Sequence, residues 1–168
     1  MSRQAVSSNK RAPLAPLLLA FALLCAACAQ SPPPMKIVKE SQHANGLVVG
    51  VPEGFEARQT EDGFVVEPQG NTNRDVRFPV AAYVSLVKGV PKDDVSLRSK
   101  SVGGKEVQYN VTKSEGGSGG ETYTLNVFER VAGGYIKYSQ AMQSEDGEPD
   151  FALCWTLVGS TKYQPKNN

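Results

Sequence analysis

The feature that most limits the fold is a series of alternating segments separated by paired glycines. Three segments in the second half of the chain place apolar residues at every second position, which is typical of strands with one buried face. They are Lys105–Ser114, Glu121–Arg130 and Gly134–Gln143. Gly103-Gly104 and Gly133-Gly134 mark the turns before two of them, because paired glycines favour tight hairpins. The sequence therefore predicts an antiparallel sheet built of hairpins.

Shorter apolar runs extend this sheet toward the N-terminus. Val84 and Tyr83 fall on opposite faces of the run VAAYVSLVKG, which predicts another half-buried strand. Before it, GLVVGVP and GFVVEP are two further apolar strands. We expect these two to pair with each other across EGFEARQTED, and we expect EGGSGG to form a hairpin tip.

The last segment changes to the period of a helix. Apolar residues recur at i, i+3, i+4 and i+7, which form one helical face. They are Phe151, Cys154, Trp155 and Val158. Asp146 or Asp150 can cap the N-terminus, Glu148 suits the positive end of the helix dipole, and Gly159 is a natural stop.

A strand is the alternative for this segment, with residues 151, 153, 155 and 157 on one side. We choose the helix and expect it to lie on the antiparallel sheet, which gives an α+β sandwich. Trp155, the single tryptophan, would then be the largest side chain of the core.

The N-terminus has the pattern of a secretory signal peptide. Arg3, Lys10 and Arg11 precede an apolar run that contains no acid and ends in small residues. The unbroken apolar part after Pro16 is about a dozen residues, or roughly 18 Å of helix, which is well short of the ~30 Å hydrocarbon core. We therefore expect a cleaved signal and not a transmembrane helix.

The end of that run resembles the lipobox of bacterial lipoproteins. Cys28 follows two alanines, as a lipid-accepting cysteine does, although Cys25 stands where leucine is usual. The resemblance implies acylation of Cys28 and, because Ala29 follows it, sorting to the periplasmic face of the outer membrane. Such an acylated N-terminus stays on the lipid bilayer. The alternatives are Cys25 as acceptor, which the large Leu24 disfavours, and an ordinary signal peptide cut near Ala29.

Cleavage before Cys28 changes the charge and leaves one domain. It removes three cations and no acid, so the net charge moves from +1 to −2, which excludes the basic footprint of a nucleic-acid binder. We predict a signal peptide over 1–27, a Pro-rich tether over 28–44 and one domain over 45–168. Cys154 is then the one cysteine of the domain, and we expect it to be a buried apolar residue.

The domain lacks the residue types that catalysis and zinc binding need. The single histidine, His43, falls in the predicted tether, so no imidazole is placed to act as a base beside Cys154. One histidine and one cysteine cannot supply the four N or S ligands of a zinc site. The sequence therefore predicts no enzyme and no cofactor. Carboxylates can ligate calcium, but the run from Glu145 lacks the spacing of a Ca²⁺ loop.

Charged loops are the candidate sites of contact with a partner. The acids before the predicted helix fit a basic surface on a partner, or else cap the helix from a solvated loop. The polar loop NTNRDVRFP and the acids near Pro91 are further candidates, because surface loops commonly carry function. The residues selected are Arg74, Asp75, Arg77, Asp93, Asp94, Glu145, Asp146 and Glu148. Tyr135 is another, although a half-buried strand position explains it better.

The order of these segments resembles the PsbP-like sandwich domains. The resemblance rests on NGLVVGVPEGFEA, GFVVEP, VGGKEVQYNV, ETYTLNVFER, GYIKYSQAM and a last helix ending near VGSTKY. Within that group the chain resembles periplasmic immunity lipoproteins that act against type VI secreted cell-wall hydrolases. This implies a non-catalytic protein that occludes the active site of such a toxin. The alternatives are an accessory lipoprotein of an envelope complex and, last, a carboxylate-based hydrolase.

Changing Cys28 to serine tests the lipid anchor. Because Cys28→Ser removes the acyl acceptor, we expect the variant to be unprocessed or to leave the membrane fraction, while Cys25→Ser keeps the wild-type distribution. Cell fractionation with immunoblotting measures both. Full processing of Cys28→Ser together with membrane retention would contradict the lipoprotein prediction.

Overall fold

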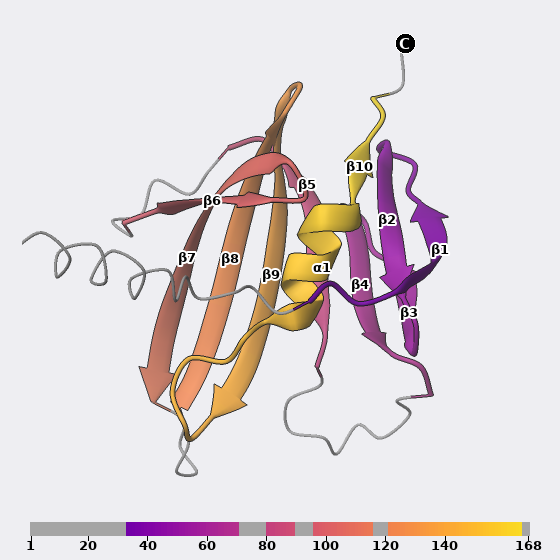
Figure 1. Ribbon diagram of the computed structural model, residues 1–168. Coiled ribbons are helices and arrows are strands. Elements are labelled where there is room, and N and C mark those ends of the chain that lie inside the picture. The colour runs from indigo at the N-terminus through magenta and orange to yellow at the C-terminus, as the bar shows by residue number, and fades with distance from the viewer. Residues whose placement is uncertain (1–32, 71–79, 90–95, 116–120, 166–168) are drawn as a thin grey trace, which may run out of the picture. The chain divides into compact units, whose positions relative to one another are not determined.

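The computed structural model describes residues 33–70, 80–89, 96–115 and 121–165 (Figure 1). These residues form a seven-stranded and a three-stranded antiparallel sheet with one helix, which confirms the predicted α+β class. The elements are β1 (Ile37–Gln42), β2 (Leu47–Pro52), β3 (Phe55–Gln59), β4 (Gly63–Pro68), β5 (Ala82–Val87), β6 (Arg98–Val102), β7 (Lys105–Glu115), β8 (Glu121–Val131), β9 (Gly134–Ser144), α1 (Ala152–Ser160) and β10 (Lys162–Tyr163). No helix in these ranges is long and apolar enough to cross a membrane.

The predicted hairpins occupy one half of the seven-stranded sheet, whose order is β3-β4-β5-β9-β8-β7-β6. Gly103-Gly104 turns β6 into β7, as the sequence indicates, whereas the turn from β8 to β9 is Ala132-Gly133, because Gly134 already pairs with Val131. β7 and β8 pair from Val107↔Glu129 to Glu115↔Glu121. They are therefore the arms of one hairpin, whose tip at 116–120 lies outside the described residues. Figure 1 shows β7, β8 and β9 side by side as the longest strands.

The pairing predicted for the two N-terminal apolar strands is wrong. β4 pairs with β3 and β5, whereas β2 pairs with β1 and β10 in the smaller sheet. The reason is that the presumed connection contains a strand of its own, Phe55–Gln59, which aligns Ala57 with Val66 of β4. Gly63 permits β4 to approach β5 closely, because a side chain there would collide with the Val84 carbonyl.

The folded domain also begins earlier than the sequence indicates. Residues 37–42, assigned to the tether, form β1 and pair with β2. His43, also assigned to the tether, is buried: its Nε2–H donates to the Thr60 carbonyl (3.0 Å) and its Nδ1 accepts the Asn45 N–H (3.2 Å). This corrects the predicted boundary, because residues 37–43 belong to the domain. The start of the predicted tether lies outside the described residues.

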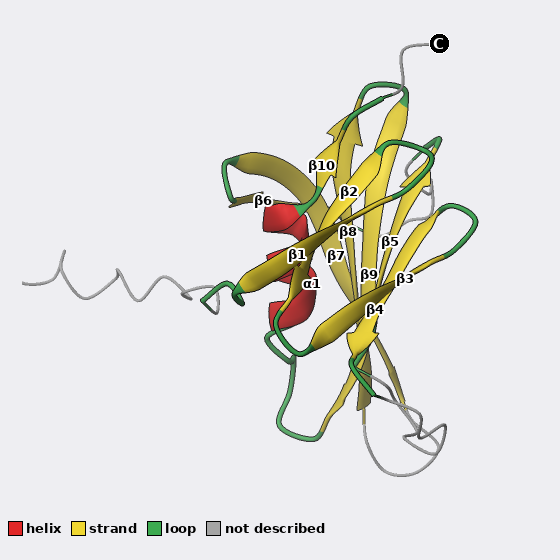
Figure 2. Cartoon of the chain, turned by 90° about the vertical axis from the view of Figure 1, so that its right-hand side faces the viewer, coloured by secondary structure: helices red, strands yellow, loops and turns green. Residues whose placement is uncertain are grey.

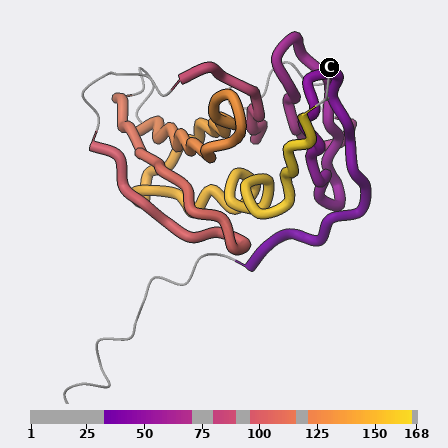
Figure 3. The backbone as a smooth tube through the Cα atoms, turned by 90° about the horizontal axis from the view of Figure 1, so that it is seen from above, coloured from indigo at the N-terminus to yellow at the C-terminus, as the bar shows by residue number. Residues whose placement is uncertain are grey.

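Helix α1 forms the core together with the inner face of the large sheet. It packs against β2 of the smaller sheet and against β5, β6, β8 and β9 of the larger one. Figures 2 and 3 show the helix enclosed between the long strands and the smaller sheet. Its buried side chains join one apolar cluster with those of the strands. The helical members are Leu153, Cys154, Leu157 and Val158.

Side chains satisfy two backbone donors at the start of the helix, although the N-cap itself is Phe151 and not a predicted aspartate. Asp150 Oδ1 accepts the Ala152 N–H (3.0 Å), and the buried Gln140 Oε1 accepts the Cys154 N–H (3.0 Å), so two free donors of the first turn are satisfied. Trp155 is not the largest core side chain, because it is only partly buried. Tyr138 and Phe64 are the largest fully buried ones.

A polar network ties the end of the helix to the long strands. Lys105 Nζ donates to Glu129 Oε2 (3.0 Å) and to the Thr161 carbonyl (2.5 Å), while Tyr138 OH donates to the same Glu129 oxygen (2.7 Å). Burial, and next the Glu129 carboxylate, raise the pKa of Tyr138 well above its usual 10.0, so the hydroxyl keeps its proton. Because partly buried charges need their partners, the network should contribute to stability.

Glu129→Gln tests this network. The amide keeps the shape of the side chain but not its charge, so we expect the free energy of unfolding to fall by about 1–3 kcal/mol in urea denaturation. The control is Glu40→Gln, which removes the partner of Lys162 from an exposed ion pair and should have a much smaller effect. Equal effects of the two substitutions would contradict the role of the network.

Candidate binding surface

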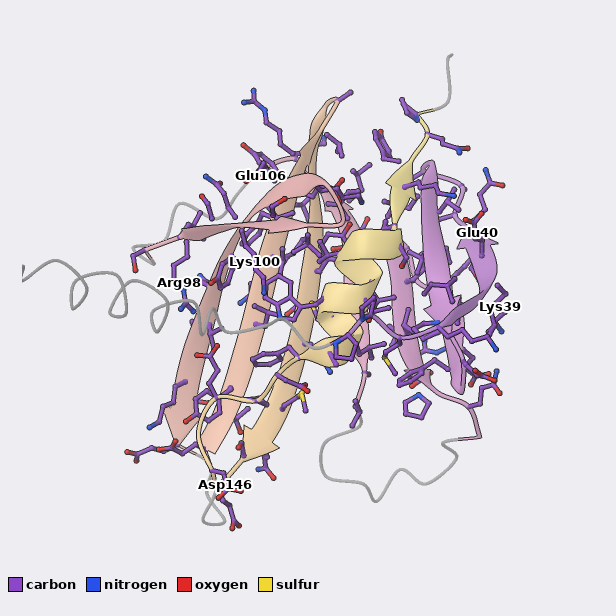
Figure 4. All side chains as sticks on the ribbon, viewed as in Figure 1. Lys39, Glu40, Arg98, Lys100, Glu106 and Asp146 are labelled. Atoms are coloured by element: carbon purple, nitrogen blue, oxygen red, sulfur yellow. The ribbon has the colours of Figure 1, made fainter. Side chains whose placement is uncertain are left out.

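An acidic turn joins β9 to the helix. We define it by its four acids, Glu145, Asp146, Glu148 and Asp150, all of which are exposed. Figure 4 shows Asp146 at the far end of the long strands. Asp150 accepts the Ala152 N–H but is not the N-cap, which is Phe151 and makes no side-chain capping bond. The structure thus brings three predicted contact residues together on one turn, and their role in binding stays a prediction.

An ion pair with a tyrosine lies near this turn, on the inner face of β7 and β8. Glu121 accepts the Tyr123 hydroxyl (2.5 Å) and pairs with the Lys113 ammonium. The hydrogen bond with Lys113, and next that with Tyr123, lower the pKa of the Glu121 carboxyl. The pKa of Tyr123 is raised mainly by the hydrogen bond that its hydroxyl donates to Glu121, with a small contribution from the charge of Glu148. Glu121 pairs with Ser144 in the register of the sheet, so this ion pair lies beside the acidic turn, which begins at Glu145.

A second group of side chains joins β6, β7 and α1. We call it the aromatic–basic cluster, and it consists of Arg98, Lys100, Tyr109 and Trp155. The rings of Tyr109 and Trp155 meet edge to face, with centroids 5.4 Å apart. Lys100 Nζ lies 4.2 Å from the Trp155 ring centroid, and the Arg98 guanidinium carbon lies 4.7 Å from that of Tyr109. Each cation therefore makes a cation–π contact with one ring.

The cluster concentrates positive charge on the edge strand β6. Among the described residues, no carboxylate lies within 4.0 Å of Arg98 or Lys100. Partial burial lowers the pKa of the Lys100 ammonium from its usual 10.5, because its surroundings disfavour the charged form. Figure 4 shows both side chains on β6, where that strand crosses in front of the long strands.

The opposite face of the large sheet carries a row of polar side chains. Asn126 Nδ2 donates to Asn110 Oδ1 (3.3 Å), and Ser139 Oγ donates to Asn126 Oδ1 (3.1 Å). Tyr83 stands beside Ser139 in the register of the sheet and is 55% exposed. Asn110, Asn126 and Ser139 are neutral and bonded to one another, so these three side chains offer a charged partner little, although Lys137 lies on the same face.

The other predicted site residues lie outside the described residues. They are Cys28, Arg74, Asp75, Arg77, Asp93 and Asp94. Tyr135 is half-buried in β9, as the strand interpretation of the sequence favours. Sequence reasoning missed the aromatic–basic cluster. The spacing of Arg98 and Lys100 shows that they share one face of a strand, but their rings come from elements that no local pattern connects.

Cys154 and His43 are both structural in the described part of the chain. Cys154 is fully buried, and burial raises the pKa of its thiol well above the usual 9.0, which confirms its predicted apolar role. Both ring nitrogens of His43 bind backbone groups. Within the described ranges, no three His, Cys, Asp or Glu side chains are grouped to hold a metal ion, and no buried side-chain N or O lacks a hydrogen-bond partner.

Comparison with known proteins identifies relatives over most of the domain. The sequence profile of the Type six secretion immunity 3 domain (Tsi3) matches residues 48–162, which run from β2 to β10. Immune protein Tsi3 of Pseudomonas aeruginosa strain PAO1 is 36% identical over 148 residues, covering 88% of this chain and 97% of that protein. A 1.50 Å crystal structure from Bacteroides thetaiotaomicron VPI-5482 matches with a TM-score of 0.54 at 12% identity, so it shares the fold alone. The match covers 78% of this chain and half of that one.

Alkylation of Cys154 tests the packing of the helix. In protein that starts at Ser31, Cys154 is the single cysteine, and we expect iodoacetamide at about pH 8 to label it on the order of 100-fold more slowly in the native state than in urea. Mass spectrometry follows the reaction. Equally rapid labelling of the native protein would contradict a buried thiol.

Proposed function

Because the chain belongs to the Type six secretion immunity 3 domain family, we propose that it protects its cell from a cell-wall-degrading toxin delivered by a type VI secretion system. Members of this family are immunity proteins, so the chain is not an enzyme and its partner is a cognate effector toxin. The cell wall as the target is supported by the resemblance of the sequence to lipoproteins that block wall hydrolases. The N-terminal export pattern supports it too, because the wall lies outside the inner membrane.

We propose that inhibition works by occlusion of the toxin's active site. An occluding surface binds best when its groups are already held in place, since ordering them on binding weakens the affinity. The acidic turn fits this requirement. One end of it continues β9, which pairs with β8 along its whole length, and the other end leads to the fully buried Phe151. These exposed acids, carried on a short turn between a paired strand and a buried residue, are the observation that carries the proposed function.

Charge gives this surface a second advantage. Acidic groups at the rim of an interface raise the rate of association with a basic partner surface. The proposal therefore includes a basic patch on the toxin opposite Glu145, Asp146 and Glu148. The five charged residues predicted at 74–77 and 93–94 are further candidates for the same interface.

We place the protein at the periplasmic face of the outer membrane, held by an acyl chain on Cys28. The lipobox-like sequence supports this placement. Met35 is already fixed to the domain, because its N–H donates to Thr156 Oγ1 (3.0 Å). The seven residue steps from Cys28 to Met35 span at most about 25 Å, so an anchored domain stays close to the bilayer and beside the wall that it protects.

Recovery of the partner tests the proposed function. The domain from Ser31 onward serves as bait for native cell extract, and mass spectrometry identifies what it retains. We expect one stoichiometric hydrolase, and we expect the purified hydrolase to stop releasing labelled peptidoglycan fragments when one equivalent of the domain is added. Recovery of resident envelope subunits without a hydrolase would contradict the proposal and favour the accessory-lipoprotein alternative.

Neutralising the acidic turn tests its role in this complex. We expect Glu145→Gln combined with Asp146→Asn and Glu148→Gln to slow association with the hydrolase by roughly tenfold at low salt, because steering by charge is lost. Surface plasmon resonance measures the rate. The matched control changes three acids of the β3–β4 hairpin, as Glu56→Gln, Glu61→Gln and Asp62→Asn, and should leave most of the rate intact. Equal slowing in both triple variants would show that net charge alone matters.

A further inference from the structure

The two cations of the aromatic–basic cluster have no carboxylate partner among the described residues. Arg98 and Lys100 each lie on an aromatic ring, yet none of the carboxylates in the described ranges is within 4.0 Å of either cation. Both residues belong to β6, which is the edge strand of the large sheet. Arg98 is exposed and Lys100 is partly buried. The cluster is therefore accessible from the edge of the sheet.

A cation that lies on a ring keeps most of its bonding capacity. The ring attracts the charge through its face, while the guanidinium still has five N–H donors and the ammonium three. A carboxylate suits them best, because it accepts paired, charge-assisted hydrogen bonds. Partial removal of Lys100 from water strengthens this preference, since electrostatic attraction grows as the surroundings become less polar.

The residues around the two cations have the composition of an interface core. Tyr109 and Trp155, whose rings lie against the two cations, are partly buried and pack against the core on the inner side of the sheet. Tyr, Trp and Arg are the residue types enriched where proteins bind each other. The acidic turn lies on this side too, because it leads into α1, which covers the inner face (Figure 1).

We propose that the aromatic–basic cluster docks onto a carboxylate-bearing surface of the toxin, with Arg98 and Lys100 donating hydrogen bonds to those carboxylates. The identity of the occupant rests on the proposed function. The cluster and the acidic turn then present opposite charges to one partner from two places on the same side of the sheet. This arrangement fixes the orientation of the toxin, because a reversed docking would bring like charges together.

The test removes the two charges but keeps the side chains that cover the rings. We expect Arg98→Met combined with Lys100→Met to bind the purified hydrolase at least about tenfold more weakly in isothermal titration calorimetry. The matched control is Lys39→Met combined with Lys137→Met. It removes one cation from the smaller sheet, Lys39, and one from the opposite face of the large sheet, Lys137. It should bind within about twofold of the wild type. Unchanged affinity of the Arg98 and Lys100 variant would overturn the proposal.

A conservative variant separates charge from packing. Lys100→Arg keeps a cation over Trp155, so it should retain the wild-type affinity. Arg98→Met combined with Lys100→Met should keep a cooperative thermal transition, which circular dichroism measures. The single variant Lys100→Met is measured beside Lys100→Arg. If Lys100→Arg weakens binding as much as Lys100→Met does, the cluster acts through packing and the proposed contact with carboxylates is wrong.

The outcomes separate this proposal from the proposed function. If the recovered partner is not a hydrolase but the double Met variant still loses binding to it, the docking surface stands and the toxin class is wrong. If the partner is a hydrolase whose affinity the variant leaves unchanged, the function stands and the docking surface is wrong. Binding of the wild type, but not the variant, to phosphatidylglycerol vesicles, with toxin affinity unchanged, would assign the cluster to the membrane surface and overturn the proposal.

Discussion

The whole domain depends on how helix α1 shields the inner face of the large sheet. Four helical side chains join one apolar cluster with residues of β2, β4, β5, β7, β8 and β9, so a single helix closes a core between two sheets. Polar groups fix both of its ends. Gln140 binds the Cys154 N–H in the first turn, and the Lys105 ammonium binds the Thr161 carbonyl after the last. The helix cannot shift along the sheet without breaking one of these contacts.

Because helix α1 is short, part of the inner face of the large sheet remains available for binding. Nine residues cover only part of the inner face, and the long strands continue beyond them. Aromatic and apolar side chains at the border of the core, such as Tyr109, Met142 and Trp155, are therefore only partly buried. Acids gather where β9 returns to the helix, and cations gather on β6. The same packing that stabilises the fold thus places charged groups on a rigid frame, which suits a protein that works by binding.

Local patterns predicted the elements whose burial alternates, and failed where the partner strand lies far away in sequence. The double-glycine hairpins and the strands from Lys105 to Ser144 were predicted because pairing between chain neighbours follows from turn and period alone. β1 was missed because most of its side chains are exposed, so it has no apolar period to detect. β2 and β4 were paired wrongly because both are apolar, and composition cannot assign two such strands to different sheets.

The candidate site likewise has one part that the sequence predicted and one part that it did not. The acidic turn was predicted because Glu145, Asp146 and Glu148 are neighbours in sequence. The aromatic–basic cluster was not, because Lys100 meets Trp155 only once β6 lies over the helix, a contact between residues 55 positions apart. The buried environment of Cys154 was predicted, whereas the partial exposure of Trp155 was not. Hydrophobicity indicates which residues prefer the core. Whether a side chain is fully buried depends on its position in the fold, and Trp155 lies at the border of the core.

The central claim is that the toxin binds the inner, helix-bearing side of the large sheet. Hydrogen–deuterium exchange of the domain with and without its purified partner tests this most directly. The account predicts added protection over residues 98–111 and 145–151, with little change in β1 and at the β3–β4 turn. Protection limited to exposed positions of the opposite face, around Tyr83 and its neighbours in β5, would contradict it.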